Sequence, residues 1–322
     1  MFNNSSNLMF FSSLTFSISL AMSSNSMIMI WIMIEMSNMS FIPLMMNKKM
    51  KNSESIMKFF IIQSLTSMIL IFSMMMNLLE TENNFMLMML LSLIMKMGGA
   101  PFQAWMISMI EGIKFETMFI MFTVMKLAPL NLISIINLNM NMIIIISLII
   151  PTIMIINQTM TKKMLAYSSI INLSMMLILT SNIKMWIYFM INYFLIMYLI
   201  VIELKNNKIK FINQMMFNSK TKLSKMNMAI SMFSLGGMPP LLGFFNKILV
   251  MKIIIENKEM LLMFLFMISS TFMMFMYMKF MTSYLMFYLS MNKTGLKKKS
   301  LNESLKLMIN FIFLPMIILS KI

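Results

Sequence analysis

"KMGGAPFQAW", residues 96–105, places a lysine, two glycines and a proline at the end of a long apolar stretch. Buried charge and an interrupted backbone are both unfavourable in hydrocarbon. A second segment, "FSLGGMPPLLGFFNK" at residues 233–247, repeats the Gly-Gly-x-Pro pattern and also contains a lysine. The two segments predict a membrane protein in which two helices are broken within the apolar core.

The composition supports this class. The chain has 322 residues, of which 60% are hydrophobic and 11% are charged, and its mean hydropathy is +0.84. A soluble domain of this size carries about twice that share of charged residues. The alternating pattern of a membrane β-barrel is missing. We therefore expect an all-α polytopic membrane protein.

The lengths of the apolar runs and the polar residues that separate them predict about eleven membrane helices. The fourth and the ninth contain the two Gly-Gly-x-Pro segments. The expected spans are 5–24, 27–46, 56–79, 85–104, 117–137, 141–157, 165–181, 185–204, 228–250, 260–289 and 306–321.

Lysines concentrate in alternate loops between these spans. Basic loops stay on the non-translocated side of a membrane, so the N-terminus is expected on that side and the C-terminus on the other. The net charge of +16 then reflects membrane topology, and we expect no nucleic-acid partner. The lysines of the basic side are Lys48, Lys49, Lys51, Lys114, Lys162, Lys163, Lys205, Lys208, Lys210, Lys220, Lys222, Lys225, Lys293, Lys297, Lys298, Lys299 and Lys306.

The two broken segments lie five predicted helices apart. Because five is odd, a second copy of the unit would cross the membrane in the opposite direction, as in the inverted repeats of ion-coupled transporters. The expected division is a first five-helix repeat at 1–137, a second at 138–289, and a basic loop with a C-terminal helix at 290–322. The matched hinge residues are Gly98 with Gly236, Gly99 with Gly237, and Pro101 with Pro239.

Four ionisable residues lie deep in predicted spans: Glu35, Lys96, Lys126 and Lys247. Each is unfavourable there by roughly 2.5 to 3.5 kcal/mol unless it is paired or solvated. Burial favours the neutral form of a lysine, whereas a nearby carboxylate favours the charged form. We therefore expect a contact between Glu35 and Lys96 to control the proton of Lys96. Water linking the three lysines would complete a proton relay.

Other charged residues in the spans lie nearer the predicted helix ends. Lys58, Lys252, Lys279 and Glu203 are expected to extend toward the headgroups.

The missing residue types exclude several functions. The chain has no histidine and no cysteine, so it lacks the usual ligands of haem, iron–sulfur clusters, copper and zinc. It also has no arginine, which argues against the ATP synthase proton-path subunit, as the lack of histidine argues against cytochrome b and the oxidase core. Its 55 methionines and scarce valines indicate an AT-rich gene in which ATA encodes methionine. This points to a mitochondrial gene of an insect or another animal.

Five stretches resemble the antiporter-like membrane subunits of mitochondrial NADH:ubiquinone oxidoreductase, respiratory complex I. Nearly the whole chain shares the likeness, and "LGGMPPLLGF" followed by lysine is its most specific part. The stretches are "EMSNMSFIPL", "KMGGAPFQAW", "KLAPLNLI", "KKMLAYSSI" and "FSLGGMPPLLGFFNK".

The resemblance implies a proton-translocating subunit of the mitochondrial inner membrane, driven by quinone reduction elsewhere in the complex. Glu35, Lys96, Lys126 and Lys247 would form the relay. FMN, iron–sulfur clusters and ubiquinone would belong to partner subunits, with no cofactor on this chain. The partners would be other membrane-arm subunits and phospholipids such as cardiolipin, with the N-terminus in the matrix and the C-terminus in the intermembrane space.

The chain departs from the family at two positions. Gln103 and Asn172 stand where family members often have histidine. Amides can hold water but do not change charge near neutral pH. We expect them to line a water path with Tyr167, Ser168 and Ser169. Two alternatives stay open: a free-standing cation/proton antiporter of the same ancestry, and a structural membrane subunit without transport.

Overall fold

The computed structural model describes residues 5–46, 50–79, 83–136, 138, 140–215 and 222–290. Within these ranges the chain is helical and has no β-strand, which confirms the all-α class. Hydrocarbon offers no partner to backbone groups, so each crossing segment must bond internally as a helix. The expected spans 5–24 and 27–46 are α1 (Ser5–Ser23) and α2 (Met27–Met45).

Two expected spans are interrupted helices, at the positions where the Gly-Gly-x-Pro segments lie. The fourth, expected at 85–104, contains most of α4 (Asn83–Met97) and the break, and α5 (Ala104–Ile110) continues beyond its expected end. The ninth consists of α11 (Lys222–Gly236) and α12 (Leu242–Glu256).

The fifth expected span is also interrupted, which the sequence did not lead us to expect. It consists of α6 (Phe115–Phe122) and α7 (Val124–Ile136). Thr123 lies between them with φ −115° and ψ −72°, and its Oγ1 donates to the carbonyl of Phe119 at 2.7 Å. Pro129 has no amide hydrogen, so the helical bond to Met125 is also missing. The helix is therefore irregular on both sides of Lys126.

The remaining expected spans to residue 290 also correspond to helices. They are α3 (Met50–Leu79), α8 (Asn141–Ile155), α9 (Thr161–Leu179), α10 (Ile183–Asn206) and α13 (Met260–Ser290), with a short 3-10 helix, η1 (Ile212–Met215), after α10. The expected span 306–321 lies outside the described residues, so the total of eleven stays a prediction. Five described helical segments are long and apolar enough to cross a membrane: Met27–Met45, Met50–Leu79, Phe115–Ile136, Ile183–Asn206 and Met260–Thr282.

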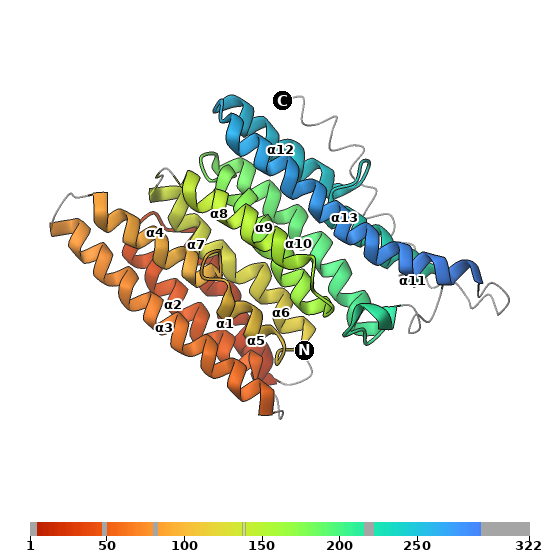
Figure 1. The fold of residues 1–322 in the computed structure, drawn as a ribbon. Coiled ribbons are helices and arrows are strands. Elements are labelled where there is room, and N and C mark those ends of the chain that lie inside the picture. Colours follow the sequence, from red (N-terminus) through yellow and green to blue (C-terminus); the bar gives the residue numbers. More distant parts are fainter. Residues whose placement is uncertain are drawn as a thin grey trace. The chain divides into compact units, whose positions relative to one another are not determined.

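The chain divides into two compact units. The first unit comprises Met1–Ile150 and Asn172–Ile183, and the second comprises Pro151–Ile171 and Lys184–Ile322. In the first unit α1 packs on α2 and α3 packs on α4, while α7 contacts α1, α2 and α4 (Figure 1). In the second unit α11 and α12 both pack on α13. The boundaries expected at 137 and 289, and the inverted relationship of the repeats, stay predictions.

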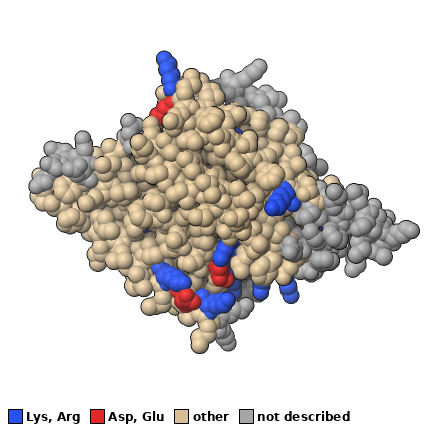
Figure 2. Space-filling view, viewed as in Figure 1, with Lys and Arg blue, Asp and Glu red and all other residues tan. Residues whose placement is uncertain are grey.

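The outer surface is largely apolar. On the face drawn in Figure 2, lysine and glutamate are few and most of the visible surface is uncharged. Large apolar side chains such as Met68, Phe72, Phe264 and Phe275 are exposed. Exposed apolar side chains of this kind suit contact with lipid or with neighbouring subunits.

Candidate proton-transfer site

The break after α4 is formed by glycine. Gly98 has φ +68°, a conformation that only glycine adopts readily. Its amide donates to the carbonyl of Met95 at 3.1 Å, and the amide of Gly99 donates to that of Ile94 at 2.9 Å. This pair of bonds is the Schellman motif that ends many helices.

The last carbonyls of α4 also receive bonds from side chains. Gln63 Nε2, on α3, donates to the carbonyl of Lys96 at 3.0 Å. Trp105 Nε1, on α5, donates to the carbonyl of Met95 at 3.1 Å. We expected water or polar side chains at these carbonyls, and here protein groups satisfy them. Neither Gln63 nor Trp105 was predicted, because their roles depend on which helices are neighbours.

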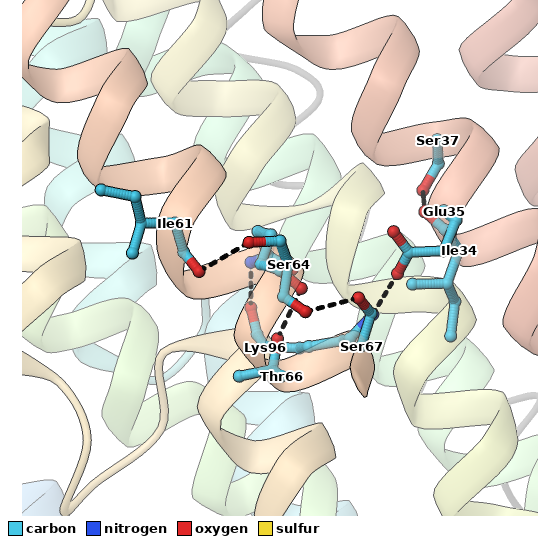
Figure 3. A network of polar contacts seen from close by, with 9 residues as sticks. Ile34, Glu35, Ser37, Ile61, Ser64, Thr66, Ser67 and Lys96 are labelled. Atoms are coloured by element: carbon cyan, nitrogen blue, oxygen red, sulfur yellow. Dashed lines mark hydrogen bonds and ion pairs between the residues drawn. The ribbon is translucent and has the colours of Figure 1, made fainter. Parts of the chain in front are cut away.

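Glu35 and Lys96 form the contact that their sequence positions suggested. Lys96 Nζ lies 2.6 Å from Glu35 Oε1, and the two residues come from α2 and α4 (Figure 3). The Lys96 side chain is 1% exposed and that of Glu35 is 24% exposed. The carboxylate offsets part of the hydration that the buried ammonium loses. The pair is thus a charged contact between two helices that lie far apart in the sequence.

Lys126, on α7, is buried in the same unit, with 1% of its surface exposed. Its Nζ lies 6.0 Å from the centre of the Phe122 ring, at the outer limit of a cation–π contact. Lys96 and Lys126 line one cavity, together with Ser37, Asn38 and Gln63. The centre of a water molecule can occupy about 20 Å³ of this cavity. That is enough for one water, which needs about 10 to 15 Å³.

The break after α11 repeats the backbone of the first break. Gly237 has φ +75° and donates to the carbonyl of Ser234 at 3.0 Å, and Met238 donates to that of Phe233 at 3.1 Å. Gly98 therefore corresponds to Gly237. The expected match of Gly98 with Gly236 is wrong by one residue, because Gly236 is the last residue of α11. The aligned prolines are then Pro101 and Pro240, and both follow cis peptide bonds.

Lys247, on α12, contacts the end of α11. Its Nζ donates to the carbonyl of Gly236 at 2.5 Å and lies 3.4 Å from that of Ser270 on α13. The side chain of Lys247 also packs on Gly237, where it leaves no room for a Cβ. Lys247 belongs to the second unit, and its partners there are carbonyl oxygens of the backbone.

The residues expected to line a water path are all buried. Tyr167, Ser168 and Ser169 lie on α9, and both serines donate to carbonyls of the preceding turn, those of Leu165 and Ala166. Gln103 Oε1 and Asn172 Nδ2 are buried without a hydrogen-bond partner in the described part of the chain. Buried amide atoms of this kind are common neighbours of internal water.

One charged residue lies deeper than expected. Lys252 and Lys279 are exposed and Lys58 is half-buried, in line with their positions near helix ends. Glu203 is only 2% exposed, so the expectation that it reaches the headgroups is wrong. After α10 the chain turns back, and Phe211 pairs with Met160 ahead of α9. A pairing of two segments so far apart in sequence was not visible in the apolar pattern.

The described residues hold no group of three or more His, Cys, Asp or Glu side chains that could bind a metal ion. The site holds buried ionisable side chains, those of Glu35, Lys96 and Lys126. Broken helices that line a buried cavity with ionisable groups define a class, the ion-translocating membrane proteins.

Comparison with known proteins gives the family. Residues 24–273 match the family model described as NADH:quinone oxidoreductase/Mrp antiporter, TM. NADH-ubiquinone oxidoreductase chain 2 of Anopheles gambiae is 36% identical over 77% of this chain and 76% of its own length. The same chain of Locusta migratoria is 32% identical over 84% of this chain and 83% of its own. The chain therefore belongs to the NADH:quinone oxidoreductase/Mrp antiporter family, with the NADH-ubiquinone oxidoreductase chain 2 proteins.

Solved structures support the fold. A chain of respiratory complex I from Thermus thermophilus has a TM-score of 0.82 at 17% identity, over 88% of this chain and 71% of that chain. A chain of the Mrp complex from Dietzia has a TM-score of 0.77 at 12% identity, over 85% of this chain and 59% of that chain. At these identities the likeness concerns the fold alone.

Proposed function

We propose that this chain is a proton-translocating subunit in the membrane arm of respiratory complex I. NADH oxidation and quinone reduction take place in other subunits, which hold the FMN, the iron–sulfur clusters and the quinone. This chain carries no electrons and transfers protons through its buried ionisable side chains. The observation that carries the proposal is the Glu35–Lys96 ion pair, which lies beside Lys126 at the break of α4.

The pair provides a way to change the protonation of Lys96. While Glu35 is close, its negative charge holds the proton on the Lys96 amine. When the contact is lengthened or Glu35 is neutralised, burial favours the neutral amine, and Lys96 releases its proton. Lys126 lines the same cavity and is placed to accept that proton. Each transfer moves one proton, and no bond other than N–H and O–H bonds is made or broken.

Lys247 is the third lysine of the proposed relay. Its ammonium is bound by backbone carbonyls at the end of α11, where the helix dipole is negative. The partners of this ammonium are thus backbone oxygens and not a carboxylate. We propose that Gln103, Tyr167, Ser168, Ser169 and Asn172 hold water of the proton path. The proposed hinges are Gly98 and Gly237, together with the residues that follow each of them. They end α4 and α11, so the last carbonyls of these helices have no helical amide donor.

The chain is a multi-pass protein of the inner membrane, with other complex I subunits as its partners. We propose a matrix N-terminus and an intermembrane-space C-terminus, because the lysine-rich loops then face the matrix. Phospholipids such as cardiolipin would cover its apolar faces. A free-standing antiporter is not favoured, because the relatives from Anopheles gambiae, Locusta migratoria and Artemia franciscana are each named NADH-ubiquinone oxidoreductase chain 2.

The decisive experiment replaces Lys126 by methionine in the assembled complex. Proton translocation per NADH oxidised should fall, while a native gel still shows an assembled complex. The matched control is Lys252→Met, which makes the same change at an exposed position and should leave translocation unchanged. An unchanged proton-to-electron ratio in Lys126→Met would rule the relay out.

A further inference from the structure

Asn38 is a buried amide at the edge of the cavity that Lys96 and Lys126 share. It lies on α2, three residues after Glu35, so both side chains project from the same face of the helix. Its residue is 5% exposed, and its Nδ2 has no hydrogen-bond partner among the described residues. A buried donor without an acceptor is unfavourable, because it has lost its hydrogen bond to bulk water. The Asn38 side chain is therefore suited to donate a hydrogen bond to an acceptor that occupies the cavity.

The other polar groups of the cavity already have partners. Lys96 Nζ donates to Glu35 at 2.6 Å, and Gln63 Nε2 donates to the Lys96 carbonyl at 3.0 Å. Ser37 Oγ donates to the carbonyl of Ile34 at 2.7 Å. Asn38 thus differs from these three, because its amide nitrogen has no acceptor within the part of the chain that the structure describes.

We propose that Asn38 is a positioning residue that holds one water between Lys96 and Lys126. This inference rests on the proposed function of the two lysines as proton carriers. An N–H of Asn38 donates to the water oxygen and occupies one of its two lone pairs. The second lone pair faces an ammonium, and the two O–H bonds are directed away from Asn38 toward the remaining acceptors.

The proton balance of this step is simple. One N–H bond of the Lys126 ammonium breaks, and its proton forms a new O–H bond on the water. At the same time another O–H bond of that water breaks, and its proton forms an N–H bond on the neutral amine of Lys96. The water is regenerated, one positive charge has moved from Lys126 to Lys96, and no oxidant or reductant is needed. The reverse transfer uses the same atoms.

Asn38 is chemically suited to this role because it does not titrate. An ionised carboxylate at this position would offer only acceptors and would hold both lysines charged. An apolar side chain would offer no hydrogen bond, and the water would have one fewer partner. An amide orients the water and leaves the net charge of the cavity to Lys96, Lys126 and Glu35.

The test compares Asn38→Leu and Asn38→Asp in the assembled complex, because both substitutions keep the number of side-chain heavy atoms and the branch at Cγ. Asn38→Leu should slow NADH:ubiquinone turnover about five- to ten-fold, which corresponds to one lost hydrogen bond. It should also raise the solvent deuterium isotope effect on turnover, because transfer through the water becomes rate-limiting. Asn38→Asp should slow turnover at neutral pH and regain rate at acidic pH, where its carboxyl is protonated.

The matched control is Asn131→Leu. Asn131 is also a buried amide of the first unit, but its Nδ2 already donates to the carbonyl of Ala21 at 2.8 Å. Its loss should reduce the amount of assembled complex. Turnover and isotope effect per assembled complex should stay at native values, because Asn131 does not line the cavity. Rates are therefore expressed per assembled complex, as measured on native gels.

A high-resolution map of the complex gives a readout that does not depend on rate. It should show water density between Lys96 and Lys126 in the native complex and none in Asn38→Leu. A native map without that density would overturn the inference, and so would an Asn38→Leu complex with native turnover and isotope effect. If Lys126→Met loses translocation while Asn38→Leu is native, only the role of Asn38 fails. If Lys126→Met is native, the relay itself fails.

Discussion

Lys247 Nζ donates a 2.5 Å hydrogen bond to the carbonyl oxygen of Gly236, the last residue of α11. In the first unit the lysine beside the helix break is held differently, because Lys96 bonds to the carboxylate of Glu35. The two lysines also differ in place. Lys96 lies on the helix before its break, whereas Lys247 lies on the helix after its break. The two units thus stabilise a buried ammonium by different means, a side-chain charge and a helix end.

Lys247→Met should remove the positive charge at the end of α11. An interaction of a cation with a helix C-terminus contributes about 0.3 to 1 kcal/mol on a surface and up to about 2 kcal/mol when partly buried. We expect slower turnover and a moderate loss of thermal stability of the complex. Lys247→Arg keeps the charge and should retain the stability but not the turnover, because arginine does not release its proton. Native turnover in both variants would contradict a relay role of Lys247.

Glu35→Gln should slow NADH:ubiquinone turnover by about ten-fold, equal to about 1.4 kcal/mol. The neutral amide no longer holds the proton on Lys96, so Lys96 stays neutral and cannot cycle. The matched control is Glu54→Gln, because Glu54 forms an ion pair of the same 2.6 Å length with Lys58 at an exposed position. The control should show native turnover, since solvent screens an exposed pair. Full activity in Glu35→Gln would show that the carboxylate is only structural.

Gln63→Leu should destabilise the break of α4. The carbonyl of Lys96 would lose its side-chain donor in a buried environment, which is unfavourable by about 1 to 3 kcal/mol. The expected result is a lower midpoint in a thermal dissociation assay of the complex. Gln63→Glu is the second variant, and it should be worse because a carboxylate repels that carbonyl and adds a charge next to the Glu35–Lys96 pair. A midpoint unchanged in both variants would mean that the carbonyl finds another donor.

Gly237→Ala should be harmful and Gly236→Ala tolerated, although the residues are neighbours. Alanine at Gly237 would have to adopt φ near +75°, which is unfavourable by roughly 1 to 2 kcal/mol, and its Cβ would displace the side chain of Lys247. At Gly236 a Cβ would lie 3.3 Å from the flexible thioether of Met274. The amount of assembled complex and its turnover test this order. Equal effects would show that the positive φ of Gly237 is not required.

Several features were predictable from the sequence because they depend on composition or on neighbours along the chain. Apolar runs predicted α1, α2 and α10 within a few residues, since a helix that crosses hydrocarbon must have a minimum length. A charge within such a run is rare enough to attract attention by itself, which is how Glu35 and Lys96 were found.

The register of the two breaks was not predictable in the same way. "GGMPP" offers two glycines and two prolines, and the shared Gly-Gly-x-Pro pattern favours the match of Gly98 with Gly236 over the match with Gly237. The choice depends on where α11 ends, and packing decides the end of a helix. The burial of Glu203 and the interruption at Thr123 were also not predictable from the sequence, because each depends on contacts of a particular helix end or turn.

The sequence by itself determined that the chain is a bundle of membrane helices with two broken segments and a few deep charges. Hydrocarbon imposes these features directly, because it excludes unpaired backbone groups and isolated ions. Only the tertiary structure decided which groups meet: Glu35 with Lys96, Gln63 with the end of α4, Lys247 with Gly236, and Asn38 with the cavity. These contacts join helices that are distant along the chain, and the rotation of each helix about its axis, which no local pattern encodes, determines them.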